Sequence, residues 1–343
     1  MKTTKKHSNN KGKKKTKFSW KMFISFIVFE FIFTGITGPF MLYYGPFENA
    51  RNTMVGAAMT TMTHQWIATT FLSQDRINEI LSKNKVQDIS QDNSDGDEIK
   101  IKNTHDNTIE RYNIDSEGST YKGYILIIHN PKRVKVGYSS KLPKVGETTS
   151  KIARNYRAVA AVNAGGFTDE SANGQQWAGN GGQPSGIIMS KGTTIYNDYK
   201  NNFIKDDIVA MTKEGKLLVG KHTVNELKEK NVTDAVSFGP ALIVNGKKTI
   251  KSGDGNWGTA PRTAIGQRKD GSIILLVLDG KHIKRLAATL RDVQDVLYEY
   301  GAYNASNLDG GSSTTMYYEG KVINEPSNAL GERSIPSVIY VEP

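Results

Sequence analysis

The sequence predicts an α+β (mixed α/β) fold: a single β-rich domain with few helices, residues 120–343, preceded by an N-terminal transmembrane helix. From Tyr121 onward the chain consists of short apolar runs separated by glycines, as expected of strands and turns. Residues 284–300 carry leucines and valines at helical spacing and are followed by Gly301, which predicts one long helix. Continuous apolar runs such as 273–278, beside that helix, indicate a sheet buried on both faces.

The runs that we predict as strands share β-branched or aromatic residues and end near a turn-forming residue. In chain order they read YILIIH, RVKVGYS, AVAAVN, GIIMS, IVAMT, LLVG, AVSFG, ALIVNG, TAIGQR, SIILLVLDG, TTMYYEG and SVIYVEP. A second, shorter helix is predicted at residues 148–157.

The positive charge of the chain is concentrated at its N-terminus. Of the formal net charge of +11, nine lysines lie in residues 1–21 with no acid among them, which leaves +2 for the rest. A basic tail can bind nucleic acid, but its position just before a membrane-length segment favours a topological role, so we expect no nucleic-acid partner. The absence of cysteine excludes thiol catalysis, zinc-thiolate sites and disulfides.

Residues 22–44 form a mostly apolar stretch of 23 positions that contains one charge, Glu30. At 1.5 Å per residue this length crosses about 30 Å of hydrocarbon, so we predict a transmembrane signal anchor. The lysine-rich residues 1–21 are then a cytoplasmic tail, and the catalytic domain of this single-pass cell-membrane protein is extracellular. A cleaved signal peptide is the alternative, but the stretch is long and no clear small-x-small site follows it.

Between the apolar stretch and the β-rich domain we predict two further segments. Residues 45–81 form a juxtamembrane helical segment. This segment either lies on the membrane or packs on the anchor, and the alternative is a buried helix of the outer domain. Residues 82–119 are polar and acidic, which predicts a stalk because such a composition buries little apolar area.

Glycine-rich turns with polar side chains mark candidate sites in the β-rich domain. Asn163 ends a strand and precedes Gly165 and Gly166, whose backbone amides can approach a phosphate. The loop 178–186 is dense in glycine but lacks the lysine and serine or threonine of a phosphate-binding loop, so a rim or a simple loop is expected. A tight turn with an Asn cap is the structural alternative for Asn163.

Charged side chains accompany two more turns and suit phosphate and acid–base chemistry. Arg262 starts a strand after a proline, and a guanidinium binds phosphate oxygens bidentately, although a surface salt bridge is the alternative. Asp309 precedes two glycines and four hydroxyl side chains, a pattern suited to general acid or base catalysis. Asp279 ends another strand before a glycine, and for both acids an Asp-Gly hairpin turn is the alternative.

Taken together, these motifs resemble the phosphodiester glycosidase family, which includes bacterial proteins linked to exopolysaccharide biosynthesis. The resemblance covers residues 121–343 and preserves the order of the motifs. They are HNPKRV (129–134), NAGGF (163–167), GNGGQP (179–184), FGPALIVNG (238–246), RTAIG (262–266), DG (279–280) and NLDGGSS (307–313). The resemblance implies hydrolysis of the bond between an anomeric carbon and a phosphodiester, with a sugar-phosphate or polysaccharide substrate of the cell surface or cell wall.

The resemblance also implies residue roles. Arg262 and the glycine-loop amides are expected to hold phosphate, and Asp309 and Asp279 to supply carboxylates near the anomeric carbon. The other expected substrate-binding residues are Asn163, Gly165, Gly166, Thr263, Asn307, Gly310, Gly311, Ser312, Ser313 and Thr314. No cofactor is expected, although exposed Asp clusters leave room for a bound calcium ion.

Two other function classes are alternatives to a glycosidase. A histidine-type or metal-dependent phosphodiesterase needs clustered ligands, but the six histidines are scattered and the HxK pattern at His282 has no second copy. A membrane-anchored glycan-binding or scaffold protein of exopolysaccharide or wall biosynthesis would use the same cleft without turnover.

Overall fold

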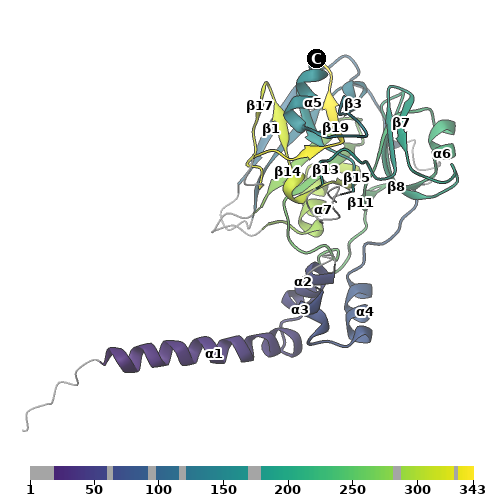
Figure 1. The fold of residues 1–343 in the computed structure, drawn as a ribbon. Helices are drawn as coiled ribbons and strands as arrows, with labels where there is room; N and C mark the ends of the chain where they lie inside the picture. The colour runs from purple at the N-terminus through teal and green to yellow at the C-terminus, as the bar shows by residue number, and fades with distance from the viewer. Residues whose placement is uncertain are drawn as a thin grey trace, which may run out of the picture. The chain divides into compact units, whose positions relative to one another are not determined.

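The computed structural model describes residues 19–59, 65–91, 98–115, 121–168, 179–280, 287–327 and 331–343 (Figure 1). The chain divides into two compact units, residues 1–48 and residues 49–343.

The first unit contains one long apolar helix. This helix, α1 (Trp20–Tyr44), begins at Ser19, whose Oγ accepts a hydrogen bond from the Met22 N–H at 3.4 Å. Its phenylalanines and isoleucines are exposed, and it is the single helix in the described part of the chain that is long and apolar enough to cross a membrane. The predicted N-terminal apolar helix is therefore confirmed, with the length and composition of a membrane anchor or a signal sequence.

Three short helices follow among the described residues between 48 and 83. They are α2 (Glu48–Met59), α3 (Trp66–Thr69) and α4 (Gln74–Lys83). Val55 and Gly56 of α2 are buried, and a Cβ atom added at Gly56 would lie 3.1 Å from the Cα of Asn256. Since Asn256 belongs to the β-rich domain, these contacts agree with the second alternative above, a helix that packs within the outer domain.

The described residues of the β-rich domain form three larger sheets and a short ribbon, in which neighbouring strands are antiparallel. The seven-stranded sheet has the order β1 (Ile109–Ile114), β2 (Lys122–Ile128), β14 (Ile273–Asp279), β13 (Arg262–Arg268), β15 (Ala302–Leu308), β11 (Ala241–Val244), β12 (Lys247–Lys248). One five-stranded sheet has the order β7 (Thr193–Asn197), β6 (Ile187–Ser190), β10 (Val232–Ser237), β8 (Asp206–Thr212), β9 (Leu217–His222). The other has the order β17 (Lys321–Val322), β16 (Met316–Tyr318), β5 (Ala160–Asn163), β19 (Ser337–Val341), β3 (Val134–Tyr138). The ribbon pairs β18 (Ser334–Ile335) with β4 (Glu147–Thr148).

The central strands of the seven-stranded sheet are buried on both faces, as the apolar runs predicted. Leu275 and Val277 of β14 join the central core that the three sheets share. Leu276 and Leu278 point to the opposite face and pack in a second core with α7 (Leu290–Glu299). Each residue of β14 is buried, because both of its faces are covered. The fold class is therefore α+β, as predicted.

The helices of the domain are few and short. Besides α7 they are α5 (Thr149–Asn155), which confirms the helix predicted at 148–157, and α6 (Val224–Glu229). The long helix predicted at 284–300 begins later, because Thr289 caps it and forms a reciprocal capping box with Asp292. Residues 281–286 lie outside the described residues.

Part of the predicted stalk, residues 82–119, forms β1 of the seven-stranded sheet. β1 pairs along its whole length with β2, from Ile109 opposite Ile128 to Ile114 opposite Gly123. Its side chains are exposed or half-buried, which is compatible with a polar sequence because an edge strand needs only backbone pairing. The prediction of a stalk was wrong for these residues.

Candidate active site

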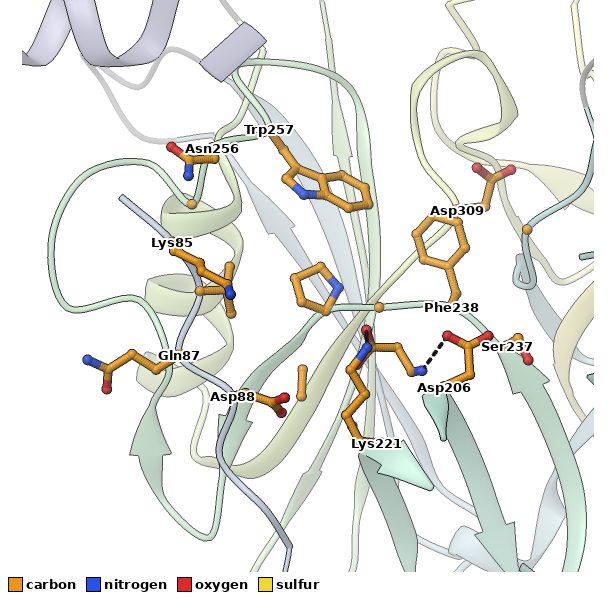
Figure 2. Close-up of a pocket in the computed structure, with 18 of the residues that line it drawn as sticks. Lys85, Gln87, Asp88, Asp206, Lys221, Ser237, Phe238, Asn256, Trp257 and Asp309 are labelled. Carbon is orange, nitrogen blue, oxygen red and sulfur yellow. Dashed lines mark hydrogen bonds and ion pairs between the residues drawn. The ribbon is translucent and has the colours of Figure 1, made fainter. Parts of the chain in front are cut away.

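A cavity of about 730 Å³ opens where the sheets meet, and we call it the central cavity (Figure 2). Its walls come from segments that are far apart in the sequence. They are Lys85–Ile89 with Gly220 and Lys221, Gly166 with Phe167 and Ser185, Asp206 with Asp207, Ser237 to Ala241, and Gly255 to Trp257 with Asp309. A pocket of this size encloses ligands larger than a single sugar.

Asp309 brings a carboxylate to this cavity directly after β15. Its backbone N–H donates to Ala164 O at 2.9 Å, and its backbone C=O accepts from Asn163 Nδ2. The residue is half-buried, and Figure 2 shows its side chain near the ring of Phe238. The backbone N–H and C=O of Asp309 are therefore held by the last residue of β5 and the residue that follows it, which fixes the main chain of Asp309 beside the cavity.

Asn163 is completely buried and joins four segments at the base of the site. Its Oδ1 accepts from Thr263 Oγ1 at 2.8 Å and from the Thr315 N–H at 3.0 Å, while its Nδ2 donates to Asp309 O. These bonds confirm that the predicted motifs around 163, 263 and 309 converge in space. With no exposed surface, Asn163 positions the other residues and does not itself face the cavity.

Of the predicted glycine pair at the end of β5, Gly166 lines the cavity and Gly165 lies behind it. The Gly165 N–H donates to Ser337 Oγ at 3.1 Å, and the Gly166 N–H donates to Ser237 O at 3.2 Å. These amides are therefore engaged within the protein, unlike the free phosphate donors that the sequence predicted.

The predicted residues that follow Asp309 form a tight 3₁₀ turn, Gly311–Ser313. Gly311 has a φ of +61°, which favours glycine, and its N–H donates to Pro261 O at 2.8 Å. Ser312 Oγ accepts from Arg333 Nη1 at 3.0 Å, and Ser313 and Thr314 are buried. Gly310 lies in the same turn beside Pro261 O. The turn is thus next to Asp309 but supplies none of the residues that line the cavity within the described chain.

Arg262 points away from the cavity, contrary to its expected role in holding phosphate. Its Nη2 donates to Trp257 O at 3.0 Å and to Gly258 O at 2.7 Å, and its Nε donates to Ala288 O at 3.1 Å. Burial lowers the pKa of this guanidinium to about 10, so it remains charged at neutral pH. Side chains alternate along β13, and Arg262 shares the α7 face with Ala264, whereas Thr263 points toward Asn163.

Asp279 lies at the same end of the seven-stranded sheet as Asp309, but in a different environment. Its Oδ1 accepts from Asn324 Nδ2 at 2.8 Å, its Oδ2 accepts from the Glu325 N–H at 3.3 Å, and burial raises its pKa. β13 lies between β14 and β15, which separates the two acids by roughly two strand spacings, about 10 Å. Asp279 does not line the central cavity, so the two predicted carboxylates do not converge on one site.

Asn307 supports the cavity wall from behind. Its Nδ2 donates to Gly239 O at 3.0 Å and its backbone N–H donates to Pro240 O at 3.1 Å. Gly239 and Pro240 in turn line the cavity next to Phe238.

No set of three or more His, Asp and Glu side chains in the described part of the chain is placed to hold a metal ion.

The model of the phosphodiester glycosidase family matches residues 156–342, more than half of the chain. The chain belongs to the phosphodiester glycosidase family.

The individual relatives of this chain are distant. The SPbeta prophage-derived uncharacterized protein YomE of Bacillus subtilis is 28% identical over 203 residues, which are 57% of this chain and 29% of that protein. Bovine N-acetylglucosamine-1-phosphodiester alpha-N-acetylglucosaminidase is 36% identical over 67 residues, 20% of this chain and 12% of the relative. The chain thus spans less than a third of the curated relatives it matches.

Among solved structures, the fold is similar to the catalytic domain of the zebrafish N-acetylglucosamine-1-phosphodiester alpha-N-acetylglucosaminidase, which is auto-inhibited by its pro-peptide. The TM-score is 0.57 at 24% identity, and the match covers 71% of this chain and 87% of that chain.

Several residues that line the central cavity were not predicted as site residues. Phe238 begins the FGPALIVNG motif, so its signal was present, and Trp257 lies in a loop with positive-φ glycines at 253, 255 and 258. Lys85–Ile89, Asp206 and Asp207 lie outside every motif, and only the tertiary structure places them on the cavity.

Proposed function

We propose that this protein hydrolyses the glycosidic bond of a sugar 1-phosphodiester in a cell-surface glycan or glycopolymer and releases the sugar and a phosphomonoester. The observation that carries the proposal is the position of Asp309, a half-buried carboxylate on the central cavity whose peptide groups are fixed on both sides. Family membership supports the reaction class.

Asp309 acts in this proposal at the anomeric carbon. The group that leaves the anomeric carbon is a phosphate monoester, which is a good leaving group, so one carboxylate that activates water or stabilises an oxocarbenium-like transition state can be sufficient. Among the other cavity acids, Asp207 is paired with Lys221 Nζ at 2.6 Å and Asp206 accepts from Tyr199 Oη at 2.7 Å. We assign the catalytic role to Asp309 because it is the cavity acid that lies in the NLDGGSS motif, directly after β15.

The location of the enzyme follows from its N-terminus. We propose that residues 22–44 anchor the chain in the cell membrane, with the lysine-rich residues 1–21 in the cytoplasm and the β-rich domain outside. This topology would place the central cavity next to wall polymer, capsule or exopolysaccharide, the polymers on which we expect the enzyme to act.

The test uses the full chain in detergent and a panel of hexose and N-acetylhexosamine 1-phosphodiesters, with released reducing sugar as the readout. We expect turnover by the wild type and a loss on the order of 10²–10⁴-fold in Asp309→Asn. Asp295→Asn is the matched control, since Asp295 is a surface acid of α7 that pairs with Lys248. Full activity of Asp309→Asn would remove Asp309 from the mechanism. Saturable binding without product in the wild type would instead support a glycan-binding scaffold.

A further inference from the structure

A second pocket lies on the α7 face of the seven-stranded sheet, and we call it the tyrosine pocket. It has a volume of about 460 Å³. It is lined by Tyr112 of β1, by Arg268 at the end of β13, and by Glu299, Tyr300 and Gly301 at the end of α7. Among the described residues, the tyrosine pocket and the central cavity share no lining residue. A pocket of this volume can bind a small ligand.

The tyrosine pocket lies toward the opposite end of the sheet from Asp309. Thr263 of β13 pairs with Leu308, so Asp309 follows at that end of the sheet. Arg268 is the last residue of β13, five positions further along the strand. At about 3.4 Å per residue, these two ends of β13 are roughly 17 Å apart. A ligand in the tyrosine pocket is therefore outside the proposed catalytic site.

Two tyrosine rings of the pocket pack against each other and are held in place. Their centroids are 5.6 Å apart with 65° between the ring planes, which is an edge-to-face arrangement. Tyr112 is 40% exposed, and its hydroxyl donates to Glu110, which also bonds to His129 Nε2 at 2.6 Å. Tyr300 is partly buried against the second core. Exposed aromatic surface is thus held in a fixed orientation, which lowers the entropy cost of binding a ligand to it.

Arg268 is positioned by the C-terminal end of α7. Its Nε donates to Tyr300 O at 2.7 Å, and its side chain lies beside Gly301, where an added Cβ would be 3.7 Å from Nε. Tyr300 is the C-cap of α7, where the negative end of the helix dipole favours a cation. The bond from Nε fixes the plane of the guanidinium, which carries further hydrogen-bond donors on its two Nη atoms.

The stability of α7 does not explain the position of Glu299. An acidic side chain is unfavourable in the last turn of a helix because the helix dipole is negative there, and this turn contains no basic residue. Glu299 lines the tyrosine pocket together with Arg268. A carboxylate provides hydrogen-bond acceptors and a guanidinium provides donors. The two side chains together therefore suit the hydroxyl groups of a sugar.

The charges around the tyrosine pocket favour a neutral ligand over a phosphate. Arg268 carries one positive charge, whereas Glu299 and Glu110 carry two negative charges, and Arg268 interacts electrostatically with Glu110. A phosphate would bring further negative charge to this pocket. A neutral sugar instead packs its apolar C–H groups on aromatic rings and bonds through its hydroxyl groups to charged side chains. The tyrosine pair beside Arg268 and Glu299 offers both kinds of contact.

We propose that the tyrosine pocket is a non-catalytic sugar-binding site, which holds an uncharged hexose or N-acetylhexosamine unit of a glycan. Binding at this site does not depend on the reaction at Asp309. The consequence for catalysis rests on the proposed function: a single sugar phosphodiester cannot span the roughly 17 Å between the two sites, so the substrate that gains from both is a glycopolymer.

The test measures the binding of neutral linear tetrasaccharides of glucose, galactose, mannose or N-acetylglucosamine to the full-length wild type in detergent by calorimetry. These sugars lack a phosphodiester, so the proposed reaction does not consume them. We expect at least one of them to bind with a Kd of about 1 mM or lower. Tyr112→Ala should weaken that binding about tenfold, and Tyr112→Phe should retain most of it because the ring remains.

Two more variants keep the test independent of folding effects. Glu299→Ala should also weaken tetrasaccharide binding, and Glu299 is exposed, so its replacement does not disturb the core. Tyr298→Ala is the matched control, because Tyr298 is 49% exposed on the same helix and does not line the pocket. The Tm of each variant is measured on the same samples. Binding by none of the tetrasaccharides overturns the inference. Equal affinity in the wild type and in both pocket variants, or an equal loss in Tyr298→Ala, also overturns it.

A kinetic comparison tests the consequence for catalysis. Its two substrates share one sugar 1-phosphate, present as a methyl phosphodiester and as a phosphodiester-linked polysaccharide. The ratio of kcat/KM for the polysaccharide to kcat/KM for the methyl diester should fall about tenfold in Tyr112→Ala, through a higher KM for the polysaccharide. An unchanged ratio overturns the assignment of a polymeric substrate. If the wild type cleaves neither substrate, the proposed function fails, whereas the tetrasaccharide measurement still decides whether the tyrosine pocket binds sugar.

Discussion

Replacement of Asn163 by Ala tests whether one buried amide holds the site together. In the native protein its side chain makes hydrogen bonds to Thr263 Oγ1, to the Thr315 N–H and to Asp309 O. Alanine removes these three bonds. It also leaves the Thr315 N–H and the Asp309 C=O without this partner in a region that water does not reach, because Asn163 is completely buried.

The expected magnitude follows from those bonds. Each contributes about 1 kcal/mol net, and a buried group left without a partner costs more, so the free energy of unfolding should fall by at least about 3 kcal/mol. For a domain of this size that corresponds to a fall in Tm of roughly 6–12 °C. The turnover number should also fall, by roughly 10²-fold, because the Asp309 carboxylate loses one of its two backbone anchors.

The assay is thermal unfolding of the full chain in detergent, followed by circular dichroism, with sugar release measured on the same samples. Asn304→Ala is the matched control, since Asn304 is also completely buried in the sheet but only its Oδ1, which accepts from the Asn245 N–H at 2.8 Å, has a partner among the described residues. We expect a loss of about 1 kcal/mol there. A Tm of Asn163→Ala equal to that of Asn304→Ala would refute the central role of Asn163.

Three further changes test other parts of the structure. Gly181→Ala should destabilise the protein by about 2–3 kcal/mol in denaturant titrations, because Gly181 has a φ of +69° and an added Cβ would lie 2.2 Å from Ser334 O. Burial lowers the pKa of His222 below its usual value, so stability should be full above pH ~6.5 and fall on acidification toward the lower folded pKa; His222→Gln should flatten this fall in Tm between about pH 7.5 and 5.5. Arg262→Lys should lower Tm because an ammonium cannot replace three guanidinium bonds to backbone carbonyls, and a higher KM at unchanged Tm would instead restore its expected role in binding phosphate.

The strands could be predicted because their apolar residues form continuous local runs. The run 273–278 is buried on both faces in β14, and the run at 337–341 pairs on both sides as β19. Such signals depend only on neighbouring residues. The predicted start of α7 was less accurate, because Leu286 continues the helical spacing ahead of Thr289, whereas the capping box of Thr289 begins the helix.

The convergence of the motifs was also predictable, but the direction of each side chain was not. Arg262 and Thr263 are consecutive, so they point to opposite faces of β13. Both faces of this sheet are covered by apolar residues, and alternation alone therefore cannot tell which face carries the site. The hydroxyl of Thr263 reaches Asn163, while the more obviously chemical Arg262 supports the Trp257 loop from behind.

The N-terminal contribution to the site had no local signal at all. Polar residues such as Gln87 and Gln91 read as a solvated stalk, because composition reports how much apolar area a segment can bury and says nothing of backbone bonds. Yet Gln87 bonds through its peptide group to Thr249, and Gln91 bonds through its side chain to β9. A segment with little apolar area can thus be held by the hydrogen bonds that a neighbouring sheet leaves open. A segment whose composition predicts a solvated linker can therefore line a cavity of the neighbouring domain, as residues 85–89 do here.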